Sequence, residues 1–291
     1  MLRFPSLKAK EKRPTLKYIR KRRRDGPLHF TLIDPDKQSA REAAALAQRM
    51  VAAGTDGILV GGSHAAHLVG LDETVRQIKQ KVKVPVILFP SAHSGLSKFA
   101  DAVFFMSLLN SRSAQYLIEE QMKGSILVRS FGIEALPMGY IIVESGATTA
   151  AGWAGDVRLI PREKPEFALG YALAAKYLGM RFVYLEAGSG AKESVPAEMI
   201  ALLKENLGPD TFVIVGGGIR DPKTAREKVK AGADIIVTGT IAERSPERAR
   251  KVIAAVKGRN GNHNARSEKR KLGLRFRKRD GRRLRLRLRK R

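Results

Sequence analysis

Three glycine-rich segments stand where a phosphate group could be held. Each follows a short apolar run and precedes a helical pattern, so each is predicted to be a turn at the end of a strand. Glycine lets the backbone N–H groups of such a turn approach an anion closely. In a (β/α)8 barrel the loops after the last strands are the usual phosphate site. We therefore expect a phosphorylated small molecule to bind at Tyr184–Gly190, Gly216–Gly218 and Gly239–Thr240.

Two carboxylates lie beside predicted strand ends. Asp34 follows the first β-rich run and precedes Pro35, a position from which a carboxylate could hold Mg2+ or accept a proton. The same Asp-Pro-Asp sequence is equally typical of a turn and a helix N-cap. Glu186 lies among the glycines and could act as a general base toward a substrate hydroxyl. The structural alternative is an acid paired with a neighbouring Lys or Arg.

Other kinds of site are poorly supported. The chain has no cysteine, which excludes disulfides, cysteine metal sites and cysteine nucleophiles and is compatible with a reducing cytosol. His29, His64, His67 and His93 lack metal-ligand spacing, because the pair at 64 and 67 has no accompanying carboxylate. No apolar run reaches the roughly 18 residues of a membrane-spanning helix. We therefore expect a cytoplasmic protein.

Eight apolar, β-rich runs alternate with helical patterns. Most of the runs are continuously apolar, as strands buried on both faces should be. Alternating β and α segments predict a parallel sheet, and eight such units over residues 27–257 predict a TIM (β/α)8 barrel. The predicted strands are Leu28–Ile33, Gly57–Val60, Val84–Phe89, Ala102–Ser107, Gly139–Val143, Arg181–Leu185, Thr211–Val215 and Asp234–Val237. The predicted helices are Gln38–Ala53, Leu71–Lys81, Ser113–Met122, Lys164–Leu178, Val195–Asn206, Lys223–Ala231 and Pro246–Val256.

Two connections depart from the regular alternation. Only Pro90–Asp101 separates the third and fourth runs, which is short for a strand–helix–strand crossover. The third helix is therefore expected to be missing or replaced by an extended segment. Ser145–Arg162 is a long loop after the fifth run, and two interpretations of it stay open. It is either a lid over the site or a surface excursion anchored by Trp153.

The net charge of +27 is concentrated at the two ends. Residues 1–26 hold 11 Lys/Arg and 2 Asp/Glu, and residues 258–291 hold 16 and 2, which leaves residues 27–257 with only +4. We expect a basic N-terminal extension with a first helix over 1–26, a catalytic domain over 27–257, and a disordered basic tail over 258–291. The tail has three open interpretations: a solvated extension, a tether to an anionic membrane surface, or a nonspecific nucleic-acid binder.

Six strings in the same order resemble the geranylgeranylglyceryl phosphate synthase family of archaeal ether-lipid enzymes. The resemblance covers about residues 27–257. The short link between the third and fourth strands is similar too, because that family's barrel lacks a proper third helix. The strings are His29–Lys37, Val60–Ser63, Ser107–Ser111, Tyr184–Gly190, Val215–Arg220 and Val237–Thr240.

The resemblance implies a prenyl transfer. The free hydroxyl of sn-glycerol 1-phosphate would attack C1 of geranylgeranyl diphosphate, and pyrophosphate would leave. By similarity, Asp34 and Ser63 would bind Mg2+, and Glu186 would take the hydroxyl proton. The residues that would hold glycerol 1-phosphate are Tyr184, Leu185, Glu186, Ala187, Gly188, Ser189, Gly190, Gly217, Gly218, Gly239 and Thr240. A homo-oligomer is the family's default.

Three alternatives to this function stay open. Heptaprenylglyceryl phosphate synthase would differ only in the prenyl length accepted. An isomerase or epimerase of sugar phosphates would need an acid/base pair at a sugar carbon but no apolar groove. A nucleic-acid-binding protein could use the basic ends, although their few aromatic residues, Phe4, Tyr18 and Phe276, offer poor stacking platforms and make nucleic acid the weakest partner.

Overall fold

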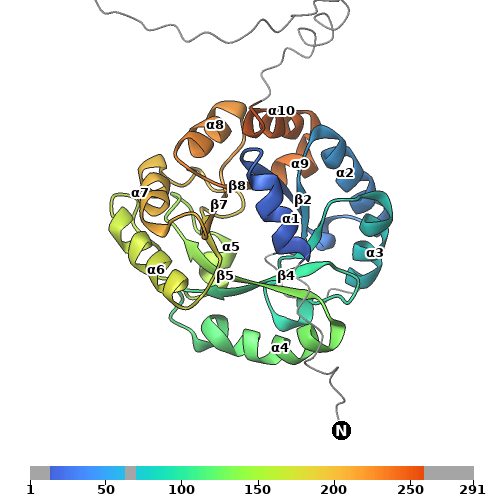
Figure 1. Ribbon diagram of the computed structural model, residues 1–291, viewed down its shortest axis with the longest axis horizontal. Helices are drawn as coiled ribbons and strands as arrows, with labels where there is room; N and C mark the ends of the chain where they lie inside the picture. The colour runs from blue at the N-terminus through green and yellow to red at the C-terminus, as the bar shows by residue number, and fades with distance from the viewer. Residues whose placement is uncertain (1–13, 63–69, 259–291) are drawn as a thin grey trace, which may run out of the picture. The chain divides into compact units, whose positions relative to one another are not determined.

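Eight parallel strands close into a barrel in the computed structural model, which describes residues 14–62 and 70–258. Neighbours along the chain pair in sequence order, and β8 returns to β1 with Leu28 opposite Ile235. The predicted TIM barrel is therefore confirmed (Figure 1). The strands are β1 Leu28–Ile33, β2 Gly57–Val60, β3 Val86–Leu88, β4 Ala102–Leu108, β5 Glu134–Ile142, β6 Phe182–Glu186, β7 Phe212–Gly216 and β8 Ile235–Thr238.

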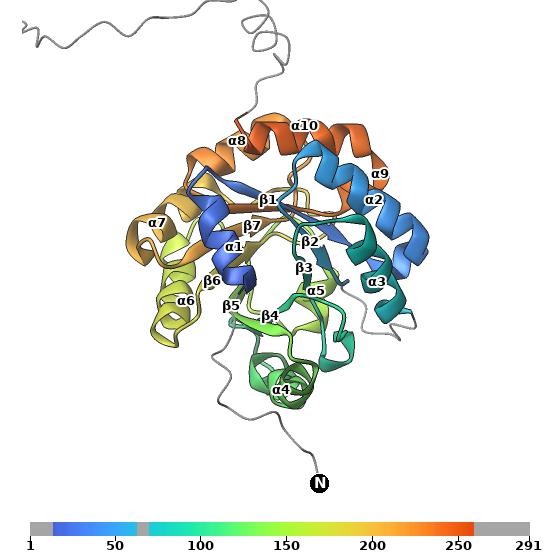
Figure 2. The same cartoon turned by 45° about the vertical axis from the view of Figure 1, so that its right-hand side comes forward.

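Helices surround the barrel, as two views of the ribbon show (Figures 1 and 2). The outer helices are α2 Ala40–Ala53, α3 Leu71–Lys81, α4 Glu120–Phe131, α6 Pro165–Tyr177, α7 Ala197–Leu207, α8 Pro222–Lys230 and α10 Pro246–Val256. Shorter turns follow several strands: η1 Pro35–Lys37, η2 His93–Gly95, η3 Gln115–Glu119, α5 Ala150–Ala154 and α9 Thr240–Arg244. None of the helices in the described ranges has the length and apolar composition needed to span a bilayer.

The third helix of the barrel is absent, as predicted. Between β3 and β4 the chain forms only the short 3-10 turn η2. The helix that follows β4 is longer than predicted: after the π-helical turn η3, α4 continues to Phe131 instead of ending at Met122. The cause is Gly124, which weakens the helical pattern in the sequence although the helix continues through it. Gly124 lies beside η2, and a Cβ there would make an ordinary contact with Leu96 at 3.4 Å.

The fifth strand begins earlier than predicted, at Glu134 rather than Gly139. Pro137 interrupts the sequence pattern, yet it faces outward and lies opposite Phe105 of β4. The other strand and helix ends lie within two residues of their predicted positions. The misplaced start of β5 is the error that matters, because Glu134 has a structural role at the N-terminal end of the barrel.

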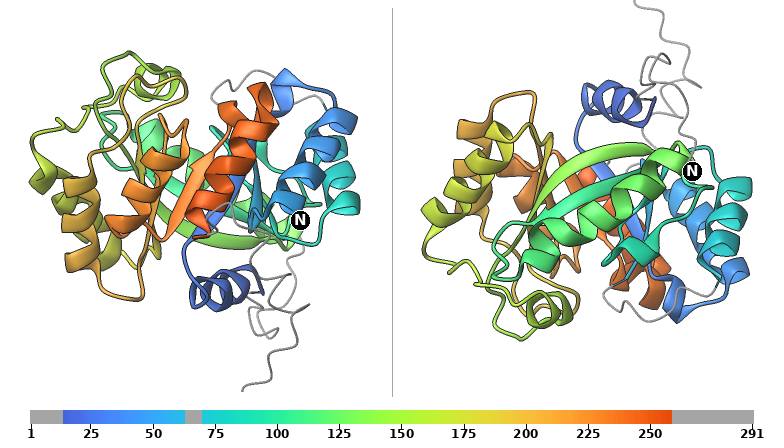
Figure 3. Two further views of the ribbon diagram at one scale, coloured as in Figure 1. Left: turned by 90° about the horizontal axis from the view of Figure 1, so that it is seen from above. Right: turned by 90° about the horizontal axis from the view of Figure 1, so that it is seen from below.

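Helix α1 Pro14–Arg23 lies across the N-terminal end of the barrel (Figure 3). Its Leu16 and Ile19 are buried against the aromatic interior of the barrel. At its start, the backbone N–H groups of Thr15 and Leu16 donate to Glu134 at 2.7 and 3.2 Å. At its end, arginines pair with buried aspartates at the starts of β2 and β8: Arg22–Asp56 and Arg23–Asp234.

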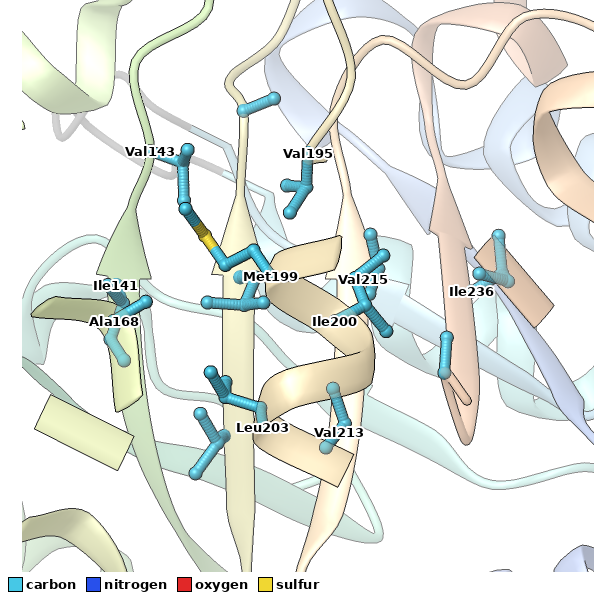
Figure 4. Packing of buried hydrophobic residues seen from close by; sticks show 14 of the residues in the cluster. Ile141, Val143, Ala168, Val195, Met199, Ile200, Leu203, Val213, Val215 and Ile236 are labelled. Atoms are coloured by element: carbon cyan, nitrogen blue, oxygen red, sulfur yellow. The ribbon is translucent and has the colours of Figure 1, made fainter. Parts of the chain in front are cut away.

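Buried aliphatic side chains fill the layer between the barrel and its helices. In one part of this layer, Met199 and Leu203 of α7 pack against Val143 and Val213 (Figure 4). The same cluster includes Val183 and Leu185, so it packs against both β6 and β7, whose far ends carry two of the glycine-rich turns. The interior of the barrel instead holds aromatic rings, among them Phe104, Phe182 and Tyr184.

Candidate functional site

A cavity of about 660 Å3 opens at the C-terminal ends of the strands. It has three parts with different chemistry. The glycine turns after β6, β7 and β8 form one wall. Asp34 and residues of α9 and α10 form a charged edge, and the segment after β3, together with β4 and α4, forms an apolar half. A phosphate, a charged leaving group and a hydrocarbon chain could therefore lie side by side in one cavity.

The glycine turns are tight enough to exclude side chains. Gly188 has a φ of +100°, and a Cβ there would lie 2.1 Å from Cγ2 of Thr149. Gly217 has a φ of +79°, and its Cβ would lie 2.4 Å from the Glu186 carboxylate. Ser189 and Thr240 bring their hydroxyls within 3.1 Å of each other across the β6 and β8 turns. The turns thus present backbone N–H groups and hydroxyls, the donors that a phosphate needs.

Glu186 ends β6 and is buried in the wall of this cavity. Burial raises the pKa of its carboxyl group, although the Gly188 N–H and the hydroxyls of Tyr184 and Tyr140 donate hydrogen bonds to it. Burial and the nearby Glu186 in turn raise the pKa of both tyrosines well above the ordinary value, so they stay protonated donors. Within the described residues, no Lys or Arg forms an ion pair with Glu186. The structural alternative, an acid paired with a neighbouring Lys or Arg, is therefore not what the structure has.

Tyr140 is a site residue that sequence reasoning missed. It lies directly opposite Tyr184 in the β5–β6 register, and the two rings are 5.2 Å apart. A tyrosine in a continuously apolar strand carries no local sign that its hydroxyl faces a carboxylate. The prediction also started this strand too late, at Gly139, which made Tyr140 its second residue. In the observed β5 Tyr140 instead lies near the C-terminal end, where barrel residues face the site.

Asp34 lies at the charged edge, immediately after β1, and is both a cap and a cavity residue. Its carboxylate accepts the N–H of Asp36 at 3.1 Å and pairs with Lys37 at 2.9 Å. Lys37 also lies 3.6 Å from Glu243, which accepts the backbone N–H of Asp34 at 3.4 Å. Gly62 faces this carboxylate so closely that a Cβ would lie 2.5 Å from it. Ser63, the second predicted metal ligand, lies outside the described residues.

Lys37 and Glu243 were also missed by sequence reasoning. Burial opposes the charge of Lys37, but Asp34 and Glu243 outweigh it and raise the pKa of the ammonium group. Lys37 follows Asp34 by three residues and could have been suspected as its partner. Glu243 is far away in the sequence and is brought to Asp34 only by closure of the barrel between β8 and β1.

The apolar half of the cavity is made by the irregular part of the barrel. The segment after β3, where a full third helix is missing, and helix α4 both line this part of the cavity. Aromatic and aliphatic side chains face the space, and the backbone of Gly124 of α4 also borders it. The lining side chains include Phe89, Leu96, Val103, Phe104, Phe105, Met106, Val128 and Tyr140.

Most predicted substrate residues meet at the cavity, but two do not face it. Leu185 and Ala187 point into the aliphatic layer between β6 and the helices, because alternate residues of a strand face opposite sides. The nine that line the cavity are Tyr184, Glu186, Gly188, Ser189, Gly190, Gly217, Gly218, Gly239 and Thr240. The contribution of Leu185 and Ala187 is therefore to the backbone of the turn, where Ala187 donates to the Gly216 carbonyl at 3.1 Å.

The long loop after β5 reaches the cavity through α5. Ala151, Ala154 and Gly155 line the cavity. Trp153 does not anchor the loop, since 81% of its surface is exposed. Anchoring comes instead from the amide of Asn110, which bonds the Ile142 backbone and, at 2.9 Å, the Arg158 carbonyl. Of the two interpretations of this loop, the surface excursion was therefore wrong about its anchor, because an isolated Trp in a loop carries no sign of which way it faces.

Comparison with known proteins finds close relatives of one kind. The profile of the PcrB family matches residues 17–257. Geranylgeranylglyceryl phosphate synthase of Methanothrix thermoacetophila is 56% identical over 221 residues, 76% of this chain and 86% of the relative. The synthase of Pyrococcus horikoshii is 52% identical over 247 residues, 84% of this chain and 95% of the relative.

A solved structure has the same fold. It is (S)-3-O-geranylgeranylglyceryl phosphate synthase from Thermoplasma acidophilum in complex with sn-glycerol-1-phosphate, 43% identical to this chain with a TM-score of 0.79. The similarity covers 84% of this chain and 98% of that one. The agreement in sequence, length and fold confirms the resemblance drawn from the strings of residues. This chain belongs to the PcrB family and is a prenyltransferase of its geranylgeranylglyceryl phosphate synthase branch.

Proposed function

We propose that the chain joins geranylgeranyl diphosphate to the free hydroxyl of sn-glycerol 1-phosphate and releases pyrophosphate, the first ether bond of archaeal membrane lipids. The observation that carries this proposal is the position of Glu186, a buried carboxylate between glycine turns suited to a phosphate and an apolar half suited to a hydrocarbon chain. The relative from Thermoplasma acidophilum, solved with sn-glycerol-1-phosphate, supports the acceptor.

The reaction breaks the bond between C1 of the prenyl group and its diphosphate oxygen, and pyrophosphate leaves with the electron pair. The acceptor hydroxyl forms the new bond to C1, and Glu186 takes its proton. A raised pKa makes this carboxylate a better base at neutral pH than an ordinary glutamate. The hydroxyls of Tyr140 and Tyr184 hold the carboxylate toward the cavity and keep it oriented for the proton.

Mg2+ fits the charged edge. Magnesium is usually bound through one or two carboxylates, with water and substrate phosphates completing its shell. Asp34 supplies one carboxylate at the cavity, and the resemblance assigns Ser63 as the second ligand. No group of three or more acidic or histidine side chains stands ready for a metal among the described residues, which suits a metal that arrives with its diphosphate. When bound, Mg2+ would neutralise charge on the departing pyrophosphate.

The apolar half favours a prenyl donor over a sugar phosphate. A sugar-phosphate isomerase or epimerase needs no wall of aromatic and aliphatic side chains, whereas a prenyl chain does. Heptaprenylglyceryl phosphate synthase activity stays an alternative, since it would use the same groups with a longer donor. Radiolabelled sn-glycerol 1-phosphate, Mg2+ and either geranylgeranyl or heptaprenyl diphosphate should give butanol-extractable label. The preferred donor separates the two synthases, and no product with either donor would contradict prenyl transfer.

Self-association is proposed through exposed apolar side chains. Phe167 and Tyr177 of α6 and Leu178, which follows it, are each more than half exposed, and so is Trp153. Large apolar side chains gathered on a surface usually mark an interface. Light scattering should give the mass of a homo-oligomer, and Tyr177→Ser with Leu178→Ser should lower it. A monomeric wild-type mass would contradict this proposal.

Peripheral membrane contact through the basic ends remains a proposal, because residues 1–13 and 259–291 lie outside the described ranges. The protein is expected to be cytoplasmic with or without it. Anionic liposomes and RNA should be sedimented with the full chain and with residues 1–257. Loss of liposome binding on truncation supports the membrane tether, whereas loss of RNA binding alone favours nucleic acid. Equal behaviour of the two proteins contradicts both.

A further inference from the structure

We propose that Arg244 and Arg248 bind the diphosphate of the prenyl donor and form, together with Lys37, a cationic clamp on the leaving group. The clamp rests on the proposed function and adds to it. It assigns a protein counter-charge to the diphosphate, separate from the metal. It also identifies the chemistry of the edge formed by α9 and α10, which none of the sequence strings includes.

The two arginines are placed at the cavity by consecutive helices. Arg244 is the last residue of α9, and Arg248 lies in the first turn of α10. Both line the cavity, as does Ser245 between the helices. Glu243, next to Arg244, accepts the backbone N–H of Asp34 at 3.4 Å. The arginines are thus carried on a segment attached to the turn that holds the proposed metal ligand.

The positive charge of the clamp is not fully neutralised by carboxylates of the protein. Arg244 and Arg248 are exposed to solvent, and neither side chain forms an ion pair or hydrogen bond with another described residue. Lys37 is shared between Asp34 at 2.9 Å and Glu243 at 3.6 Å. The three cations therefore outnumber the two carboxylates at this edge before any metal is counted. A guanidinium binds phosphate oxygens through two parallel N–H groups, so each arginine could hold two of them.

The position favours the diphosphate over the acceptor's phosphate. The glycine turns after β6, β7 and β8 offer the acceptor backbone donors and hydroxyls. The arginine nearest to the first two turns, Arg220, already donates to the carbonyls of Gly190 and Ala191. The clamp lies beside Asp34, because Glu243, next to Arg244, accepts the Asp34 backbone N–H. The donor's charged head must also lie near Asp34 if this carboxylate holds the Mg2+ that neutralises the diphosphate. As the C1–oxygen bond breaks, negative charge grows on the pyrophosphate, and fixed guanidinium groups stabilise that charge.

The test measures binding of inorganic pyrophosphate and of sn-glycerol 1-phosphate by calorimetry, each with and without Mg2+. The variant is Arg244→Gln with Arg248→Gln, and the matched control is Arg250→Gln. Arg250 lies on the same helix but pairs with Glu247 at 3.9 Å and does not line the cavity. The double variant should bind pyrophosphate at least about tenfold more weakly in both conditions, while its affinity for glycerol 1-phosphate stays unchanged. Both variants should unfold at the wild-type temperature, because the substituted side chains are exposed.

Steady-state kinetics gives a second readout. The KM for geranylgeranyl diphosphate should rise in the double variant, the KM for glycerol 1-phosphate should not, and excess Mg2+ should fail to restore the loss. Unchanged pyrophosphate affinity would overturn the clamp, and so would a loss confined to glycerol 1-phosphate, which would move the arginines to the acceptor. Failure of the proposed function looks different: the wild type would bind pyrophosphate through the clamp but transfer no prenyl group.

Discussion

The chemistry of the site centres on one carboxylate held by neutral donors. Glu186 receives hydrogen bonds from a backbone N–H and two tyrosine hydroxyls, whereas Asp34 is paired with a lysine. The two carboxylates therefore have different environments at opposite sides of one cavity. The buried one is suited to take a proton, and the charged edge is suited to receive a cation and a leaving group.

Glu186→Gln should lower turnover by about 10²–10⁴-fold, because an amide cannot accept the hydroxyl proton. The affinity for glycerol 1-phosphate should change little, since the amide still fills the same space and the glycine turns are untouched. Single-turnover rates and calorimetric binding to the variant check both parts. Turnover near the wild-type value would remove Glu186 from the role of base.

The pH dependence should reveal the same carboxylate. Glu186 acts as a base only when deprotonated, so the rate should fall as pH drops through its pKa, which burial raises above the ordinary value of 4.5. The Tyr140 hydroxyl favours the ionised form, and Tyr140→Phe should therefore move the acid limb of the pH–rate profile to higher pH. Tyr177→Phe, at an exposed site, is the control. An acid limb that Tyr140→Phe leaves in place would contradict this assignment.

Asp34→Asn should remove most activity together with its dependence on Mg2+, because a neutral amide is a poor ligand for a hard cation. A magnesium titration of the initial rate tests this, with Asp36→Asn as the control for the turn, since Asp36 is not among the cavity-lining residues. Activity that still rises with Mg2+ in Asp34→Asn would place the metal elsewhere.

At the scale of elements, the irregular parts of the barrel carry the specific features of this enzyme. The segment between β3 and β4, where the third helix is missing, lines the apolar half together with α4. At the opposite end, α1 covers the barrel, and its first turn is capped by a side chain from β5. Residues at the N-terminal end of such a barrel serve stability, and those at the C-terminal end serve chemistry.

Glu134→Ala should therefore affect stability and leave the chemistry unchanged. It removes the acceptor of two buried N–H groups of α1, and the expected loss in the free energy of unfolding is about 1–3 kcal/mol. Urea unfolding measures the loss, and kcat measured well below the unfolding temperature should match the wild type. Asp25→Ala, at an exposed residue beside α1, is the control. A wild-type unfolding midpoint for Glu134→Ala would show that the cap is dispensable.

At the scale of the whole molecule, a buried polar group links the strands where the barrel closes. His29 of β1 contacts the hydroxyls of Thr55 before β2 and Thr238 of β8 at 2.8 and 3.0 Å. Burial lowers the pKa of His29 to about 3. The imidazole is therefore neutral in the folded barrel throughout the range in which an unfolded histidine would gain a proton.

The free energy of unfolding should consequently fall as the pH is lowered. Below the unfolded pKa of 6.5, the unfolded chain binds a proton at His29 that the folded chain does not bind until about pH 3. His29 should thus reduce the free energy of unfolding by about 1.4 kcal/mol per pH unit over that range. Urea unfolding of wild type and His29→Gln should show a difference that changes with pH in this window. A difference independent of pH would mean that His29 is already protonated in the barrel.

The sequence by itself determined the barrel, its missing helix and most of the glycine-turn site, because these depend on local patterns. Apolar runs, helical periodicity and glycines at strand ends are written in neighbouring residues. The gap between the third and fourth predicted strands is short for a strand–helix–strand crossover, wherever the rest of the chain lies. The same strings of residues sufficed to identify the family.

Only the tertiary structure decided which side chains meet. Tyr140 of β5 contacts Glu186 at the end of the neighbouring strand β6. Glu243, after β8, contacts Asp34, after β1, where the barrel closes. Arg244 and Arg248 reach the cavity from the last two helices. The tertiary structure also determined that Trp153 faces solvent and that Glu134 caps the first turn of α1. Such contacts join residues far apart in the chain, and closing the barrel brings them together without leaving a pattern in the sequence around either partner.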